Sequence, residues 1–153
     1  MGAVEGIFLV GPEGATTEAV ERVRVVAGRG PEGDRHFRGP RARLNEEGMG
    51  RDLTLIEAEA LEGLAAGHGL ELEPGEHLRN VVTRGVRLDD LIGRPFRVGG
   101  VRCVGVEPCH PCRRLERLTD RSGLIKGLAG RGGLRADVVR GGELRLGDPV
   151  EPL

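Results

Sequence analysis

The sequence predicts a mainly β fold, most simply a closed or half-closed barrel with one or two helices plugging or flanking it. Three observations favour this class. The apolar residues fall in short runs, several of which alternate with polar residues, as expected for strands with one buried face. Glycine and proline occupy 27 and 9 of the 153 positions and separate these runs instead of gathering in a tail. Only one segment has the spacing of a long helix.

Eight segments have the composition of strands. They cover residues 3–10, 20–26, 51–56, 80–83, 95–98, 101–106, 135–139 and 143–146. Gly99 and Gly100 separate two of them, and a two-residue connection that permits positive φ is typical of a β-hairpin. Arg140, Gly141 and Gly142 predict a second tight turn.

The predicted long helix covers residues 57–68. Ala58, Leu61 and Leu64 recur at helical spacing, acidic residues fill the first turn, and Gly69 is available to end the helix. We expect this helix to cover one side of the sheet. Two shorter helical turns are expected, over 112–118 and 124–129.

Composition excludes several classes of protein. The 23 basic and 24 acidic residues give a net charge of -1, which disfavours a basic nucleic-acid binder. No apolar run approaches 18 residues and the start lacks the pattern of a signal peptide, so no membrane partner is expected. We expect a single cytoplasmic domain over residues 1–153. Lys126 is the only lysine and glutamine is absent, which fits a thermophile but equally fits GC-rich codon usage.

The three cysteines provide the first indication of function, since an odd number disfavours a disulfide framework. Cys103 alternates within a predicted strand, which is typical of a buried small side chain. Cys109 and Cys112 lie at a strand-to-helix junction and are followed by Arg113 and Arg114. Helix N-terminal amides and guanidinium groups favour the thiolate, which is the reactive nucleophile and metal ligand.

Other interpretations of this cysteine pair are weaker. A zinc site would need a second ligand pair at close spacing, and the four histidines are scattered along the chain. A thioredoxin-like site would need a βαβ unit, which the β-rich surroundings do not predict. Residues 113–135 carry an excess of five positive charges, which indicates either an anionic ligand or a solvated charged face.

Two polar turns contain further candidates. Asp34 and His36 follow a predicted strand, where they could orient a ligand or, in the case of Asp34, cap backbone amides of a turn. The turn over residues 75–80 carries polar groups, including Asn80, whose role depends on what faces them.

These segments occur together in an order that resembles the MOSC family, named after the C-terminal domain of molybdenum cofactor sulfurases. The resemblance extends from about residue 4 to residue 150 and is carried by Gly33-Asp34-Arg35-His36, Gly75-Glu76-His77-Leu78, Val81-Val82-Thr83-Arg84-Gly85, Leu91-Ile92-Gly93, Glu107-Pro108-Cys109-His110-Pro111-Cys112 and the C-terminal Gly141-Gly142-Glu143-Leu144-Arg145-Leu146-Gly147-Asp148-Pro149-Val150. It implies a MOSC-type β-barrel.

The resemblance also implies a chemistry. Cys112 is the expected active cysteine, either as a ligand of molybdenum in a pterin cofactor (molybdopterin) or as a sulfur acceptor, and Cys109 would modulate or resolve it. Arg113, Arg114, His36, Asp34 and Asn80 are the residues expected to bind the anionic pterin ligand. His77 stands where many relatives have asparagine, which puts contacts made by that asparagine in doubt.

Two functions follow from the resemblance. One is a molybdenum-dependent oxidoreductase or cofactor handler, which would need an electron-transfer partner to reduce small molecules. The other is a non-enzymatic persulfide carrier. Because Lys126 lies in no pyridoxal phosphate motif, pyridoxal phosphate is expected only through a cysteine desulfurase partner.

Overall fold

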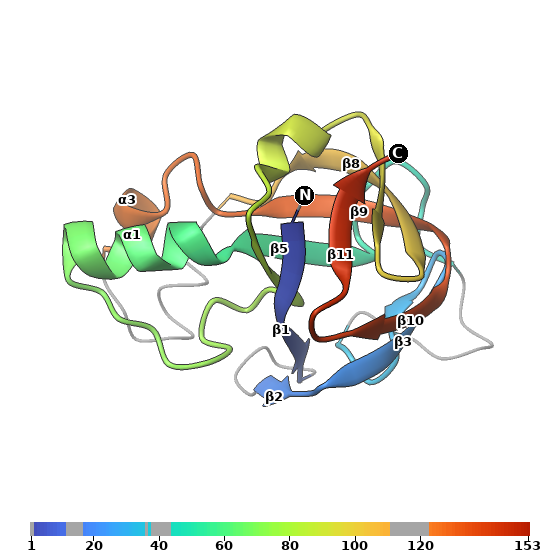
Figure 1. The fold of residues 1–153 in the computed structure, drawn as a ribbon, viewed down its shortest axis with the longest axis horizontal. Helices are drawn as coiled ribbons and strands as arrows, with labels where there is room; N and C mark the ends of the chain where they lie inside the picture. Colours follow the sequence, from blue (N-terminus) through green and yellow to red (C-terminus); the bar gives the residue numbers. More distant parts are fainter. Residues whose placement is uncertain (1, 12–16, 36, 38–43, 111–122) are drawn as a thin grey trace.

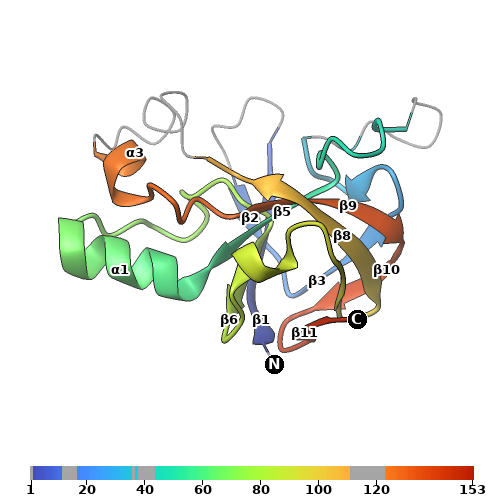
Figure 2. The same cartoon turned by 90° about the horizontal axis from the view of Figure 1, so that it is seen from above.

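The computed structural model describes residues 2–11, 17–35, 37, 44–110 and 123–153. Seven strands of this part of the chain close into a barrel (Figures 1 and 2). In spatial order they are β11 (Pro149–Pro152), β7 (Pro95–Val98), β8 (Val101–Pro108), β9 (Leu134–Arg140), β5 (Leu53–Glu57), β6 (Val81–Arg84) and β1 (Gly2–Val10). Pairing of Gly2 with Val150 closes the ring between β1 and β11. The predicted mainly β barrel is confirmed.

A smaller sheet adjoins the barrel. It contains β10 (Gly142–Arg145), β3 (Arg22–Val26) and β4 (Gly30–Pro31), in that order, while β2 (Thr17–Ala19) pairs with the end of β1. The turn at Gly141 therefore leads the chain out of the barrel into this sheet. A Cβ at Gly141 would lie 2.4 Å from the carbonyl oxygen of Val25, so this passage needs glycine.

The helices lie on the outside of the barrel. Helix α1 (Ala58–His68) follows β5 directly and ends at Gly69, whose φ of 65° is the left-handed conformation that glycine adopts without strain. It packs with α3 (Leu124–Gly127) and buries Ile56, Leu64 and Val82 between the helices and the sheet. The turn expected over 124–129 is thus observed, whereas 112–118 lies outside the described residues. No described helix is long and apolar enough to cross a membrane.

The barrel interior is an apolar core that includes Phe96, Leu53 and Cys103. Phe96 and Leu53 have no exposed surface, and Cys103 is 1% exposed. Burial raises the pKa of the Cys103 thiol, so this cysteine stays protonated. Its predicted role as a core side chain is confirmed. The predicted hairpin is also present, with Gly99 at a φ of 57° between β7 and β8.

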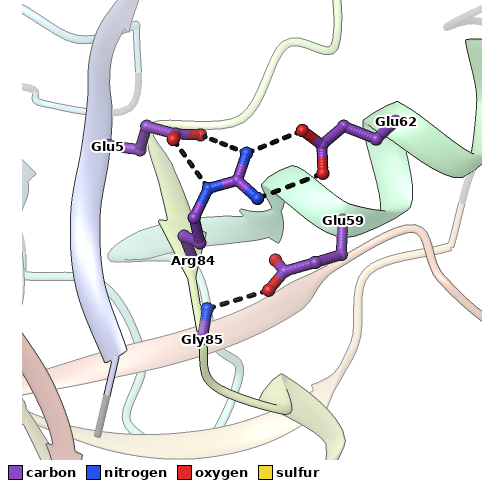
Figure 3. Close-up of polar contacts among 5 residues, drawn as sticks. All are labelled: Glu5, Glu59, Glu62, Arg84 and Gly85. Carbon is purple, nitrogen blue, oxygen red and sulfur yellow. Dashed lines mark hydrogen bonds and ion pairs between the residues drawn. The ribbon is translucent and has the colours of Figure 1, made fainter.

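Arg84 joins three elements on the surface (Figure 3). Its guanidinium group forms ion pairs of 2.8 Å with Glu5 on β1 and with Glu62 on α1. Glu59 on the same helix accepts a hydrogen bond from the backbone N–H of Gly85, also at 2.8 Å. The bonds to Glu62 and Glu5 raise the pKa of Arg84, and the bond to Arg84 lowers the pKa of Glu62. Because the charged groups are exposed, these ion pairs between β1, β6 and α1 contribute little to the stability of the fold.

A short 3-10 helix, η1 (Leu88–Leu91), was not expected from the sequence. Leu88 and Leu91 are buried against the barrel. Gly105 on β8 passes directly beneath it, and a Cβ there would lie 2.1 Å from the carbonyl oxygen of Leu91. Glycine at this position therefore permits the close contact between η1 and the barrel.

Candidate functional site

The cysteine segment begins where β8 ends. Pro108 still pairs with Leu134 of β9, and the backbone N–H of Cys109 donates a hydrogen bond to the carbonyl oxygen of Gly133 at 2.8 Å. Cys109 is buried, with 5% of its surface exposed, and His110 next to it is exposed. The sheet thus fixes the start of the segment.

Four residues predicted to act in the site lie outside the described residues. They are His36, Cys112, Arg113 and Arg114. Their roles as cysteine nucleophile, metal ligand or anion-binding groups remain predictions. The described candidates are Asp34, Asn80 and Cys109.

A buried arginine lies beside the cysteine segment. Arg79 is 6% exposed, and its Nε donates a hydrogen bond to the carbonyl oxygen of Gly132 at 2.9 Å. The backbone of Cys109 is bonded to Gly133 and the side chain of Arg79 to Gly132, so the two residues are bonded to consecutive peptide groups of one loop. A second bond, from Nη1 to the carbonyl oxygen of His77, measures 3.2 Å. A guanidinium group is always charged, so a buried positive charge lies at this end of the barrel.

His77 supports the position of Arg79. Its Nδ1 accepts a hydrogen bond from the backbone N–H of Arg79 at 3.0 Å. Burial, and then the nearby positive charge of Arg79, lower the pKa of His77 to about 4. His77 is therefore neutral at pH 7, with its proton on Nε2. Its ring meets Phe8 edge to face, with centroids 5.0 Å apart.

Leu78 turns the chain between these two buried polar residues. Its φ of 59° is the only positive φ among non-glycine residues in the described part of the chain. A leucine in this conformation costs roughly 1–2 kcal/mol. The surrounding contacts therefore enforce a backbone that buries both His77 and Arg79.

Asp34 and Asn80 meet at the same end of the barrel. Nδ2 of Asn80 donates to Oδ1 of Asp34 at 3.0 Å and to the carbonyl oxygen of Phe8 at 3.2 Å. Oδ1 of Asn80 accepts hydrogen bonds from the backbone N–H and the hydroxyl of Thr54. Asp34 also accepts the N–H of Val10 at 2.8 Å. All hydrogen-bonding atoms of the Asn80 side chain are thus used within the protein, which gives Asn80 a positioning role.

The sequence indicated polar groups in the turn over residues 75–80 and a departure from the family pattern at His77, but gave no specific role to Arg79 or Thr54. The available signal was an arginine in the turn just before an apolar strand, two residues before Val81. Arginine is rarely buried without partners, so burial of that position indicates a specific role. Within the described residues, no group of three or more His, Cys, Asp or Glu side chains is arranged to hold a metal ion.

The structure is similar to YuaD from Bacillus subtilis, with a TM-score of 0.79 and 21% identity over 99% of this chain and 96% of that one. It is also similar to YiiM from Geobacillus stearothermophilus, with a TM-score of 0.73 and 15% identity over 100% of this chain and 75% of that one. YiiM from Escherichia coli has a TM-score of 0.68 and 21% identity over 99% and 69% of the two chains.

These likenesses establish the fold, and the sequence establishes the family. No curated protein matches the chain in sequence. The family model of the MOSC domain matches residues 34–151, a segment that begins at Asp34 and includes Asn80, Cys109 and most of the barrel. The chain belongs to the MOSC domain family, whose members are related to molybdenum cofactor proteins.

Proposed function

We propose that the chain is a molybdenum-cofactor-associated domain in which Cys112 acts as metal ligand or sulfur acceptor. The observation that carries the proposal is the shared anchoring of Arg79 and Cys109 on the peptide groups of Gly132 and Gly133. The cysteine segment therefore begins next to the loop that binds the buried, positively charged Arg79. Cys112 follows Cys109 by three residues.

The chemistry of the donor set fits a molybdenum–pterin group. A thiolate is a soft ligand suited to a transition metal; Cys109 directly follows β8, and Cys112 comes three residues later in the sequence. Arginine binds phosphate through paired N–H groups, and Arg79, with Arg113 and Arg114, would hold the anionic part of the pterin. Such a cofactor supplies a redox-active metal when bound. The hydrogen bond between Asn80 and Asp34 holds together the turns at this end of the barrel.

The first test is elemental analysis for molybdenum and zinc on protein purified from a host that makes the cofactor. We expect near-stoichiometric molybdenum in the wild-type protein and its loss in Cys112→Ser. Cys103→Ala is the matched control, because Cys103 lies in the barrel core and should leave metal content unchanged. Zinc in place of molybdenum, or molybdenum unchanged in Cys112→Ser, would contradict the metal-ligand role.

A persulfide carrier is the second candidate. Lys126, the single lysine, lies in α3 and outside any pyridoxal phosphate motif, so sulfur would come from a separate cysteine desulfurase. The Cys112 thiolate would attack the outer sulfur of the partner's persulfide, and the partner's thiolate would leave, with no external oxidant. Intact-mass analysis after incubation with a desulfurase and cysteine should show one added sulfur atom. Reductant should remove it, and Cys112→Ser should lack it.

Both functions require a reduced thiol. We therefore propose a reducing compartment, the cytoplasm, where thiols persist. Reduction of N-hydroxylated or sulfur-containing small molecules would further require an electron-transfer protein. Activity that appears only when such a donor is added would distinguish the oxidoreductase from the carrier.

A further inference from the structure

A groove lies on the outer face of the barrel, over the strands β8 and β9. It has a volume of about 640 Å³. This volume falls within the range of roughly 300–1,000 Å³ that is typical of small-ligand sites. None of Asp34, Arg79, Asn80 and Cys109 lines the groove, which is therefore separate from the candidate site.

The two strands present apolar side chains to this groove. On β8 the buried Val101 and Cys103 alternate with outward-facing residues, among them Val104 and Val106. Val139 on β9 also lines the groove and is 62% exposed. Outward positions on a strand that faces water are normally polar. The three valines therefore indicate a surface that an apolar group covers.

Two of these valines lie at β-bulges. The pairing of β8 with β9 shifts its register twice, and the shifts leave Val139 on β9 and Val106 on β8 without a paired residue. A bulge changes the direction of a side chain and is common next to binding sites. The irregularities of this ladder thus coincide with the apolar surface of the groove.

A second wall of the groove is formed by residues 44–48. The backbone N–H groups of Gly48 and Gly50 donate hydrogen bonds of 2.7 and 2.9 Å to the two oxygens of Asp137 on β9. The strand itself therefore holds this segment in place. Because the groove is formed without a ligand, binding requires little ordering of the chain.

The charged groups of the groove are carboxylates. Glu47, Asp52 and Asp137 line it, whereas no lysine, arginine or histidine among the described residues does. Arg102 and Arg140 lie opposite each other further along the ladder and are not part of the lining. Negative charge next to an apolar surface favours a cation with an apolar part.

Asp137 is the carboxylate nearest to the valines along the ladder, since it lies directly opposite Val104. Each of its oxygens accepts one backbone N–H and retains a lone pair for a further donor. Asp52 is 4% exposed and adds its charge from beneath the surface. Burial, and then the charges of Asp52 and Asp137, raise the pKa of the Cys103 thiol, so the negative field of the pair extends into the core. Glu47 is exposed.

We propose that the groove binds a small amphipathic amine as its ammonium ion. The apolar part of the amine lies on Val104, Val106 and Val139. Its ammonium group donates a hydrogen bond to Asp137 and is attracted by Glu47. Hydrogen bonds between an ammonium group and a carboxylate are charge-assisted and stronger than those between neutral groups. The groove is separate from the cysteine segment, so this proposal does not depend on the proposed function.

Isothermal titration calorimetry of the full chain with octylammonium, below its micelle-forming concentration, tests the proposal. We expect saturable binding of one octylammonium ion per chain. Octanol, which lacks the charge, and octanoate, which reverses it, should each bind at least about tenfold more weakly. Absence of saturable octylammonium binding, or equal binding of octanol, would overturn the proposal. Tighter binding of a basic, apolar peptide would also overturn it, in favour of a protein partner.

Variants locate the binding to this groove. Val139→Lys and Glu47→Lys each place a positive charge in the groove and should weaken octylammonium binding about tenfold. Both residues are exposed, so the fold should tolerate these changes. Leu153→Lys and Glu18→Lys are the matched controls, because they make the same changes at exposed positions outside the groove. Unchanged affinity in both groove variants, or an equal loss in the controls, would overturn the proposal.

Discussion

Nδ2 of Asn80 donates a hydrogen bond of 3.0 Å to Oδ1 of Asp34, 46 residues earlier in the chain. This bond ties the turn after β4 to the start of β6. Both residues are buried, and the buried Arg79 and His77 lie one and three residues before Asn80 in the chain. The pair therefore holds together the end of the barrel at which the cysteine segment begins.

Replacement of Asn80 should destabilise the protein strongly. In Asn80→Ala the N–H of Thr54 and the carboxylate of Asp34 each lose a buried partner, so we expect a loss of about 3 kcal/mol in the free energy of unfolding. Urea denaturation measures it. Asn45→Ala is the control, since Asn45 donates one partly buried hydrogen bond to Asp52 and should cost about 1 kcal/mol. Equal costs for the two variants would contradict the role assigned to Asn80.

His77 should make stability depend on pH. Its pKa falls from 6.5 to about 4 on folding, so the unfolded chain binds more protons in this interval. The contribution of His77 to the free energy of unfolding is fully present above pH 6.5 and is lost as the pH falls towards 4. The total loss over this interval is about 3 kcal/mol.

His77→Asn isolates this effect, because an asparagine oxygen can still accept the N–H of Arg79 but does not titrate. The stability of the wild type relative to His77→Asn should decrease between about pH 7 and pH 4, as measured by urea denaturation at each pH. Carboxylates common to both proteins cancel in this difference. A constant difference would show that His77 is not held neutral by burial.

Two glycines of the loop that holds Cys109 differ in what surrounds them. Gly133 has a φ of 115°, and a Cβ there would lie 2.1 Å from the carbonyl oxygen of Leu55. Gly130 has a φ of 74°, with nothing within 4 Å of an added Cβ. Gly130→Ala should therefore cost about 1 kcal/mol from backbone strain alone, and Gly133→Ala about 3 kcal/mol or more. Thermal unfolding of both variants measures the difference, and similar midpoints would contradict the close contact.

The sequence predicted the parts of the fold that local patterns determine. Helix α1 and the hairpin at Gly99 have strong local signals, and both were predicted close to their observed bounds. Strand β11, which closes the barrel, was missed because Pro149 and Pro152 begin and end it. Proline cannot donate to a ladder and normally argues against a strand. β2 and β4, of three and two residues, are too short to show any alternation.

The candidate site could be predicted only in part, for a different reason. Asp34 and Asn80 were singled out separately, but their direct contact depends on the closure of the barrel, which no local pattern encodes. Arg79 was missed because an arginine in a turn is ordinarily exposed. Only the packing of the loop that contains Gly132 shows that it is buried.

The most direct test of the account is the reactivity of the cysteines with iodoacetamide in the folded protein, mapped by mass spectrometry. Both proposed functions require Cys112 to be a thiolate, whereas burial raises the pKa of Cys103 and keeps its thiol protonated. We predict that at about pH 7 Cys112 is alkylated roughly tenfold faster than the same residue in the unfolded chain, while Cys103 does not react. Alkylation of Cys112 no faster than in the unfolded chain would contradict the central claim.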